Sequence, residues 1–286
     1  MLQPSQRTLI EEQLNQKISN ATALSGGDIN EVYKIETDKE VIVVKINDLK
    51  RFLEMLEKEF RALDFLKNAS KAIYPSPILH FSDDESQYLA MKYIAEGSNS
   101  TNGQKLLGQH LADQHRCSNE SFGWEEDNYI GSLPQINALK SNWSDFYAEN
   151  RILYQIKMAF DSGIINKEVL KKAELFCAKI EEIFPKESPA LLHGDLWGGN
   201  YFIDQNDQPL FYDPAVYYGH REIDIAMTRL FGGFSTEFYE SYNESFPLEK
   251  GWESRIQYSQ LYPNLVHLNL FGVGYLSSVV DVVGRF

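Results

Sequence analysis

The sequence is poor in cysteine and contains no long apolar run. Only two cysteines, Cys117 and Cys177, occur among 286 residues, too few for a disulfide framework and without the spacing of a metal site. The most apolar late window, 261–280, is interrupted by Pro263 and by two asparagines, which argues against a membrane span. The first residues mix charged and amide side chains and lack the apolar stretch of a signal peptide. We therefore expect a cytoplasmic protein with reduced thiols.

Basic residues are also fewer than acidic residues. The chain has 27 Lys and Arg against 41 Asp and Glu, a formal net charge of −14. Because phosphate backbones and anionic membranes attract clustered basic side chains, this balance argues against nucleic acid and membrane as partners. The length, with 43% apolar residues, suits two lobes around a sizeable core. The sequence gives no oligomeric state.

The string HGDLWGGN at 193–200, followed by FYDP at 211–214, carries the most chemical information. Asn200 follows Asp195 by five positions, and Asp213 follows after thirteen more. Protein kinases space a catalytic base, a metal-binding amide and a metal-binding carboxylate in a similar way. The pattern therefore predicts phosphoryl transfer, with Asp195 accepting the proton of the acceptor hydroxyl. Asn200 and Asp213 are the predicted ligands of Mg²⁺, a hard ion that binds oxygen atoms.

These two motifs are predicted to lie at the two ends of a β-hairpin. Residues 200–203 and 209–212 are apolar and flank the turn letters DQND, the pattern of two strands joined by a turn. Such a hairpin brings Asn200 and Asp213 side by side. The alternative is a surface hairpin whose aspartates are turn residues and whose neighbour His193 belongs to the core.

The chain is predicted to open with a helix that extends to Ile18 and ends before a turn at 25–28. A glycine-containing turn followed by a strand can bring backbone N–H groups over phosphates. Gly26 and Gly27 are therefore candidate nucleotide-binding residues. The alternative is a simple hairpin turn.

Two strands are predicted after this turn, at 29–35 and 40–46. The second is rich in β-branched residues and carries Lys45, in a sequence that fits the kinase V-A-I-K strand. A lysine on such a strand can neutralise the charge of the α- and β-phosphates.

A helix is predicted from 49 to 66, because apolar residues there, Leu53 among them, recur at spacings of three and four. Three acidic residues of this helix are candidates to pair with Lys45: Glu54, Glu57 and Glu59. We favour Glu59, which flanks the apolar stripe, and we expect the others to be solvated helix surface.

A further strand is predicted at 87–94, ending where the composition changes near Glu96 and Gly97. In a two-lobed kinase the hinge lies here, and its backbone N–H and C=O groups pair with adenine. Lys92, Tyr93 and Ile94 are the predicted adenine contacts.

The order of these features resembles that of the fructosamine kinase family, also called ketosamine kinases. HGD-x4-N alone marks only the wider aminoglycoside-phosphotransferase and choline-kinase-like group. The narrower resemblance rests on four segments: Trp197-Gly198-Gly199, DPAVYYGHREIDIAMT at 213–228, DNYIGSLPQIN at 127–137 and HLNLFGVGYL at 267–276. It covers essentially the full chain.

The resemblance implies an α+β, two-lobed, protein-kinase-like fold. A small β-rich nucleotide-binding lobe would span residues 1–94 and end in the hinge, and a larger, mainly helical catalytic and substrate lobe would span 95–286. The implied reaction is ATP-dependent phosphorylation of the 3-hydroxyl of a ketosamine, a ribose, erythrose or glucose adduct of an amine. Because the 3-phosphate is prone to eliminate and release the amine, the implied role is deglycation of small amines or proteins.

The family roles transfer by motif position. They give Asp195 as base, Asn200 and Asp213 as Mg²⁺ ligands, Lys45 and Glu59 as the ion pair that orients the phosphates of ATP, and Asp224 as the carboxylate that holds the catalytic loop through backbone N–H groups. The last role is structural and not chemical.

Candidate substrate contacts are less sharply defined. Trp197 could stack against the sugar or its amine-bearing arm, with a core tryptophan as the alternative. Asn128, Gln135 and Asn137 carry amides that both donate and accept and so suit sugar hydroxyls, with a solvated loop as the alternative. Some family members have cysteine where this chain has Asp28, so a thiol switch at that position is not available, and we expect this carboxylate to face solvent or cap a backbone N–H.

Two other functions fit parts of the pattern. One is a kinase of the same superfamily acting on an aminoglycoside, choline or a homoserine-like alcohol. The other is a pseudokinase that holds a nucleotide without turnover. Against the second, the four residues on which turnover depends are all present: Lys45, Asp195, Asn200 and Asp213. The sequence leaves open which ketosamine is preferred and whether it is free or protein-bound.

Overall fold

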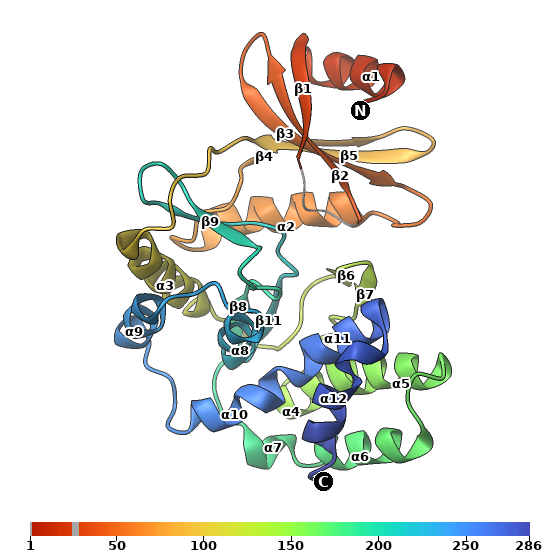
Figure 1. The fold of residues 1–286 in the computed structure, drawn as a ribbon, viewed down its shortest axis with the longest axis vertical. Coiled ribbons are helices and arrows are strands. Elements are labelled where there is room, and N and C mark those ends of the chain that lie inside the picture. Colours follow the sequence, from red (N-terminus) through yellow and green to blue (C-terminus); the bar gives the residue numbers. More distant parts are fainter. Residues whose placement is uncertain (1, 25–28) are drawn as a thin grey trace.

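The N-terminal part of the protein is an antiparallel sheet flanked by two helices. The computed structural model describes residues 2–24 and 29–286. The five strands lie in the order β1-β2-β3-β5-β4. Their bounds are β1 (Ile18–Leu24), β2 (Glu31–Thr37), β3 (Val41–Asp48), β4 (Pro77–Ser82) and β5 (Ser86–Lys92). Figure 1 shows this sheet between α1 (Pro4–Leu14) and α2 (Met55–Ala69), above a larger helical part.

Strand β3 lies at the centre of the sheet because its β-branched residues suit a surface that is buried on both faces. Ile42, Val44 and Ile46 point to one face and pack in a cluster with Ile10 of α1. Since successive side chains alternate between faces, Lys45 points to the opposite face, toward α2. The central position of β3 thus places the lysine in the interior of the protein, where it is buried.

The predicted opening helix is too long by about one turn. Helix α1 ends at Leu14, and the next residue, Asn15, adopts a left-handed conformation (φ 50°) in which its N–H bonds the carbonyls of Glu11 and Glu12. Asparagine tolerates this conformation and therefore terminates helices. Ile18 begins β1 instead of continuing the helix. Strand β1 was not predicted from the sequence, because most of its side chains are exposed and its apolar residues do not alternate regularly with polar ones.

The predicted helix at 49–66 also differs at its start. Helix α2 begins at Met55, and the preceding Glu54 has a positive φ of 57°, which breaks the helical path. Leu53 therefore lies outside the helix, with 64% of its surface exposed, and is not part of the apolar stripe. Of the remaining apolar positions of the prediction, Leu56 and Leu63 are buried as expected, and Phe60 is partly buried against the same core.

The rest of the chain is mainly helical. Its helices are α3 (Thr101–His115), α4 (Trp143–Asp145), α5 (Tyr154–Asp161), α6 (Lys167–Cys177), α7 (Ile180–Ile183), α8 (Glu222–Leu230), α9 (Thr236–Ser245), α10 (Trp252–Ser259), α11 (Leu261–Phe271) and α12 (Leu276–Val283), with a π-helical segment at Phe146–Leu153 and a short 3-10 turn at Val273–Tyr275. Within residues 2–24 and 29–286, no helix combines the length and the hydropathy needed to cross a bilayer.

Three short strand pairs stand beside these helices: β6 (Asn128–Ile130) with β7 (Leu133–Gln135), β8 (Ala190–Leu192) with β11 (Tyr217–Gly219), and β9 (Tyr201–Ile203) with β10 (Pro209–Phe211). The last pair is the predicted hairpin, in antiparallel register with Phe202 opposite Leu210. One continuous apolar cluster runs from α2 into the helical part. The chain leaves the sheet at Lys92 and enters α3 at Thr101, and the predicted lobe boundary at residue 94 lies within this connection.

Candidate active site

The HGDLWGGN segment forms a loop between β8 and β9, held from behind by a carboxylate of α8. Asp224 accepts hydrogen bonds from the backbone N–H of His193 at 2.7 Å and of Gly194 at 2.9 Å. Gly194 has a left-handed φ of 84°, and a Cβ at this position would collide with the carbonyl oxygen of Ala215. Glycine is therefore required here. These contacts fix the backbone that carries Asp195.

Asp195 and Asn200 contact each other across this loop. The Nδ2 of Asn200 donates to the backbone oxygen of Asp195 at 2.8 Å and to its Oδ2 at 3.2 Å. Because the amide nitrogen is used in this way, Oδ1 is the atom of Asn200 that remains to bind a cation. Burial, reinforced by the negative charge of Asp213, raises the pKa of Asp195 to about 7. A cation placed between the two carboxylates would lower that pKa again.

Asp213 lies two residues after the end of β10 and is connected to the N-terminal sheet through Lys45. Its backbone is left-handed, with φ 53°, which turns the chain sharply after the strand. Oδ1 of Asp213 and Oε1 of Glu59 both bind the Nζ of Lys45, the second at 2.6 Å. Burial alone would lower the pKa of Lys45, but the charges of Asp213 and Glu59 outweigh it and raise the pKa above its usual value. The lysine is therefore a fixed positive charge between the two parts of the protein.

The oxygen atoms gathered here fit a magnesium ion. Asn200 offers Oδ1, and Asp213 offers a carboxylate whose side chain is half-exposed and lines a cavity. Proteins hold Mg²⁺ through one or two such side chains, and substrate phosphates and water complete the octahedron. Across residues 2–24 and 29–286, no group of three or more His, Cys, Asp or Glu side chains forms a metal site, so a cation here would depend on phosphate ligands.

Two adjoining cavities open at Asp195. The larger, of about 370 Å³, has walls from both parts of the chain, including Lys45, Glu59, Asp195, Asn200 and Asp213. The smaller, of about 160 Å³, has mostly apolar walls from α8 and α11. Both share Gly131, Asp195, Trp197, Leu270 and Phe271. The carboxylate of Asp195 thus lies where a molecule in one cavity would meet a molecule in the other.

Trp197 is a cavity wall and not a core residue. Its side chain is 39% exposed and packs edge-on against Phe231, with 6.1 Å between ring centres. A Cβ at Gly199 would collide with the indole ring, which explains why glycine follows in the Trp-Gly-Gly sequence. The indole face is therefore available to a ligand beside Asp195.

Gln135 is the clearest departure from the predicted site. It is 1% exposed and lies in neither cavity. Its Nε2 donates to Asn128 Oδ1 at 2.8 Å and to Ala215 O at 3.1 Å, and its Oε1 accepts from the Tyr262 hydroxyl at 2.8 Å. Its hydrogen-bonding groups are thus engaged within the protein, because β6 and β7 fold inward against the segment after Asp213. In this structure the predicted sugar contact Gln135 therefore does not reach either cavity.

The two other amides of this segment are also engaged. Asn137 is buried and bonds Glu126 O and Asn128 Oδ1, both at 3.0 Å. Asn128 lines the larger cavity, but its Nδ2 donates to Val216 O at 2.9 Å. Of the three predicted amide contacts, only Asn128 lines one of these two cavities. The hydrogen bonds of Asn128 hold the 127–137 segment in place.

A buried arginine, which sequence reasoning did not single out, supports this same segment. Arg151 is fully buried in the π-helical stretch and donates to the Oδ1 of Asn137 at 2.8 Å. Its guanidinium stacks 4.0 Å from the ring centre of Tyr217. Arginine is rarely buried without such partners. No local sequence pattern distinguishes it from a surface arginine.

The predicted hinge residues, Lys92, Tyr93 and Ile94, line neither of these cavities, whereas Lys45 lines the larger one. Gly26, Gly27 and Asp28 fall outside the described residues. The backbone N–H of Lys92 donates to Ser76 O at 2.9 Å, and that of Tyr93 donates to Val41 O at 3.4 Å. Two of the three predicted hinge donors are thus used within the protein, so adenine would depend on carbonyl groups and on Ile94.

Cavity residues that sequence reasoning missed come from segments of unassigned role. Arg51 and Lys58 line the larger cavity from the α2 side, and Tyr129 lines it from β6. Phe271 lines both cavities from the end of α11. It belongs to the HLNLFGVGYL segment, which contributed to the family resemblance but to whose residues the sequence assigned no role.

Comparison with a solved structure of low sequence identity defines the fold. The chain superposes with a TM-score of 0.66 on an aminoglycoside phosphotransferase in complex with AMP-PNP and hygromycin B, at 14% identity and covering 98% of this chain and 96% of that one. At this identity the likeness shows the fold alone. The protein has the α+β, protein-kinase-like fold of small-molecule phosphotransferases.

Closer relatives then define the family. The family model described as fructosamine kinase matches residues 1–286. A candidate fructosamine-3-kinase from Thermobifida fusca superposes with a TM-score of 0.86 at 32% identity, covering 97% of this chain and 96% of that one. A protein named probable ketoamine kinase from Enterococcus faecium is 38% identical, over 98% of this chain and 99% of its own length. Protein-ribulosamine 3-kinase of Arabidopsis thaliana is 35% identical, over 99% and 87%. The chain belongs to the fructosamine kinase family.

Proposed function

We propose that the protein transfers the γ-phosphoryl group of ATP to the 3-hydroxyl of a ketosamine, free or attached to a protein. The observation that carries this proposal is the position of Asp195 at the junction of two cavities. One of them contains the Lys45 ion pairs, and the other has an aromatic and aliphatic wall. Membership of the fructosamine kinase family supports the choice of acceptor.

In the proposed reaction Asp195 accepts the proton of the attacking hydroxyl. Burial and Asp213 raise the pKa of Asp195 to about 7 without a cation, and Mg²⁺ between the two carboxylates would lower that pKa, so the carboxylate would be ionised and able to accept a proton at neutral pH. Hydrogen bonding to Asn200 holds the carboxylate in place before the substrate arrives. Asp195 therefore needs little reorganisation when the hydroxyl attacks.

Lys45 and the oxygen ligands act on the phosphates. Lys45, fixed by Glu59, neutralises charge on the non-transferred phosphates of ATP. Asn200 Oδ1 and the Asp213 carboxylate would hold Mg²⁺. When bound there, the ion would supply positive charge to the phosphate oxygens. Adenine is proposed to bind at Lys92, Tyr93 and Ile94. Residue 94 is also the proposed boundary between the two lobes. The proposed location of the reaction is the cytoplasm.

The test is ATP consumption with Mg²⁺ against a panel of acceptors. Ribulosyl-lysine and fructosyl-lysine represent ketosamines, and choline and an aminoglycoside represent the sister families. We expect turnover on at least one ketosamine and less than about 1% of that rate on the other acceptors, because the chain belongs to the fructosamine kinase family and the smaller cavity beside Trp197 has Asp195 as its one carboxylate among the described residues, too little charge to hold a polycationic aminoglycoside. Turnover only on choline or the aminoglycoside would contradict the proposal, and nucleotide binding without turnover would favour a pseudokinase.

Trp197→Ala is expected to raise the KM for the ketosamine about tenfold, which corresponds to loss of about 1.4 kcal/mol of stacking and burial. The KM for ATP should stay within about twofold, since no phosphate-binding group is removed. Steady-state kinetics with each substrate varied in turn measures both constants. The matched control is Phe160→Ala, a similarly exposed aromatic of α5 that lines neither cavity. Equal effects of the two substitutions, or a change confined to the KM for ATP, would refute the stacking role.

A further inference from the structure

A buried chain of polar side chains lies behind the catalytic loop. His115, the last residue of α3, is 2% exposed. Its Nε2 lies 3.1 Å from Oδ2 of Asp224 on α8, and its Nδ1 lies 2.8 Å from the hydroxyl of Tyr242 on α9. Asp224 and Tyr242 are equally buried. Helix α3 thus meets α8 and α9, which lie more than 100 positions later in the sequence, at one imidazole.

The direction of these hydrogen bonds follows from the chemistry of the groups. A carboxylate only accepts hydrogen bonds, so Nε2 of His115 must carry the proton in its contact with Asp224. The same carboxylate accepts the backbone N–H groups of His193 and Gly194. Asp224 therefore has three donors, two from the catalytic loop and one from His115. Burial alone would raise the pKa of Asp224. The hydrogen bond and charge of His115 and the contacts with His193 outweigh burial, so the pKa of Asp224 lies below its usual value.

We propose that His115 is a positioning residue for phosphoryl transfer, with Tyr242 as its support. Held on one side by the Tyr242 hydroxyl, the imidazole fixes the plane of the Asp224 carboxylate. That carboxylate in turn fixes the loop carrying Asp195. The inference rests on the proposed function only in taking Asp195 as the reacting base.

The proposal depends on how freely the Asp224 carboxylate rotates when the hydrogen bond from His115 is absent. The terminal torsion of aspartate is broad, because it joins an sp³ to an sp² carbon. Rotation of the Asp224 carboxylate would move the acceptors of His193 and Gly194. Asp195 follows Gly194 directly, so the shift would reach the base, and a misplacement of about 1 Å can cost about 10²-fold in rate. Neither His115 nor Tyr242 lines the cavities at Asp195.

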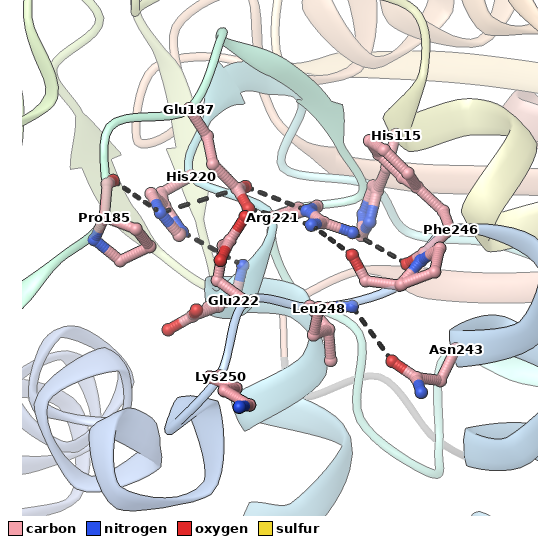
Figure 2. A network of polar contacts seen from close by, with 12 residues as sticks. His115, Pro185, Glu187, His220, Arg221, Glu222, Asn243, Phe246, Leu248 and Lys250 are labelled. Carbon is pink, nitrogen blue, oxygen red and sulfur yellow. Dashed lines mark hydrogen bonds and ion pairs between the residues drawn. The ribbon is translucent and has the colours of Figure 1, made fainter.

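A second buried imidazole nearby provides a matched control. Figure 2 shows His220 among the contacts around Glu187 and Arg221, with His115 on the other side of Arg221. His220 is fully buried, and its Nε2 lies 3.3 Å from Pro185 O. Its hydrogen bonds do not include Asp224 or the loop at 193–200. Removing His220 creates the same kind of buried defect without releasing the loop.

The experiment compares His115→Leu, His115→Gln and His220→Leu in steady-state phosphorylation of a ketosamine, with rates expressed per folded molecule. His115→Leu is expected to lower kcat about 30-fold, within the range of about 10 to 100 found for side chains that orient a reacting group from behind. Both KM values should stay within about threefold, because no ligand contact is lost. His115→Gln keeps an N–H donor and should recover to within about fivefold of wild type. His220→Leu should keep kcat within about twofold.

A double variant with Asp224 gives a second measurement. A purely structural role of His115 would not make its effect on kcat depend on the residue at position 224. If His115 acts through the carboxylate, His115→Leu in an Asp224→Asn background should lower kcat by less than about twofold, since coupled residues are non-additive. The proposal is overturned if the full 30-fold loss appears in that background, if His220→Leu lowers kcat as much, or if glutamine restores nothing.

Failure of the proposed function would look different. A wild-type protein that does not phosphorylate any ketosamine contradicts the acceptor assignment but leaves the loop geometry open to test. In that case the slow hydrolysis of ATP by water, with Mg²⁺ and no acceptor, serves for the same comparison of variants. Equal hydrolysis rates for wild type and His115→Leu would overturn the positioning role independently of the acceptor.

Discussion

Replacing Asp195 by asparagine is expected to lower kcat about 10³-fold, in the middle of the range for loss of a general base. The substitution preserves size and keeps an oxygen that can accept the hydrogen bond from Asn200, but an amide cannot take the hydroxyl proton. The KM for ATP should change less than about threefold, because the phosphate-binding groups are untouched. Steady-state kinetics on a ketosamine, with thermal unfolding to show that the variant is folded, measures the effect.

The control for this prediction is Asp161→Asn, the same chemical change at an exposed aspartate of α5. It should leave kcat within about twofold of wild type, because a surface substitution away from the site changes little. If Asp195→Asn keeps more than about a tenth of wild-type kcat, the proton leaves by another route and the assignment of the base is wrong.

The Lys45→Met variant is expected to lose both activity and stability. Removing one partner of a buried ion pair costs about 3 to 5 kcal/mol, because the remaining charge is left buried and unpaired. Here Glu59 would lose its 2.6 Å partner and Asp213 its only ion-pair partner among the described residues. Loss of charge stabilisation at the phosphates should lower kcat/KM for ATP by about 10² to 10³-fold.

A double variant separates these two effects. Lys45→Met with Glu59→Leu replaces the pair by apolar side chains, a change that is often neutral for stability. We expect the urea midpoint to return most of the way to wild type while activity stays low. Activity restored along with stability would show that Lys45 is only structural. The exposed pair Lys157 and Asp161, at 2.9 Å, is the control, since Lys157→Met should cost less than about 1 kcal/mol.

The parts of this site that could be predicted are those that depend on residues close together in the sequence. The β9–β10 hairpin followed from two apolar runs around a polar turn, and it brings the segments of Asn200 and Asp213 together. Lys45 followed from the alternation of a β-branched strand, and Glu59 from helical spacing. Each of these inferences used fewer than twenty consecutive residues, and the ion pair between Lys45 and Glu59 is present in the structure.

The parts that could not be predicted depend on contacts between distant segments. Gln135 looks like a solvent-facing loop amide in the sequence, but its partners are Ala215 and Tyr262, 80 and 127 positions away. His115 meets Asp224 across 109 positions, and nothing in either local sequence indicates the pairing. Strand β1 was missed for a different reason, because it is a largely exposed edge strand without a regular alternation of apolar and polar residues.

The most direct test of the account is whether the acceptor needs its 3-hydroxyl. The ketosamine that the panel shows to turn over and its 3-deoxy analogue should be compared at equal concentration with ATP and Mg²⁺, following ADP by a coupled assay and the free amine by chromatography. The account predicts one ADP per ketosamine, followed by release of the amine, here lysine, and no ADP above background from the 3-deoxy compound. Equal ADP formation from both compounds, or a stable product that never releases lysine, would contradict it.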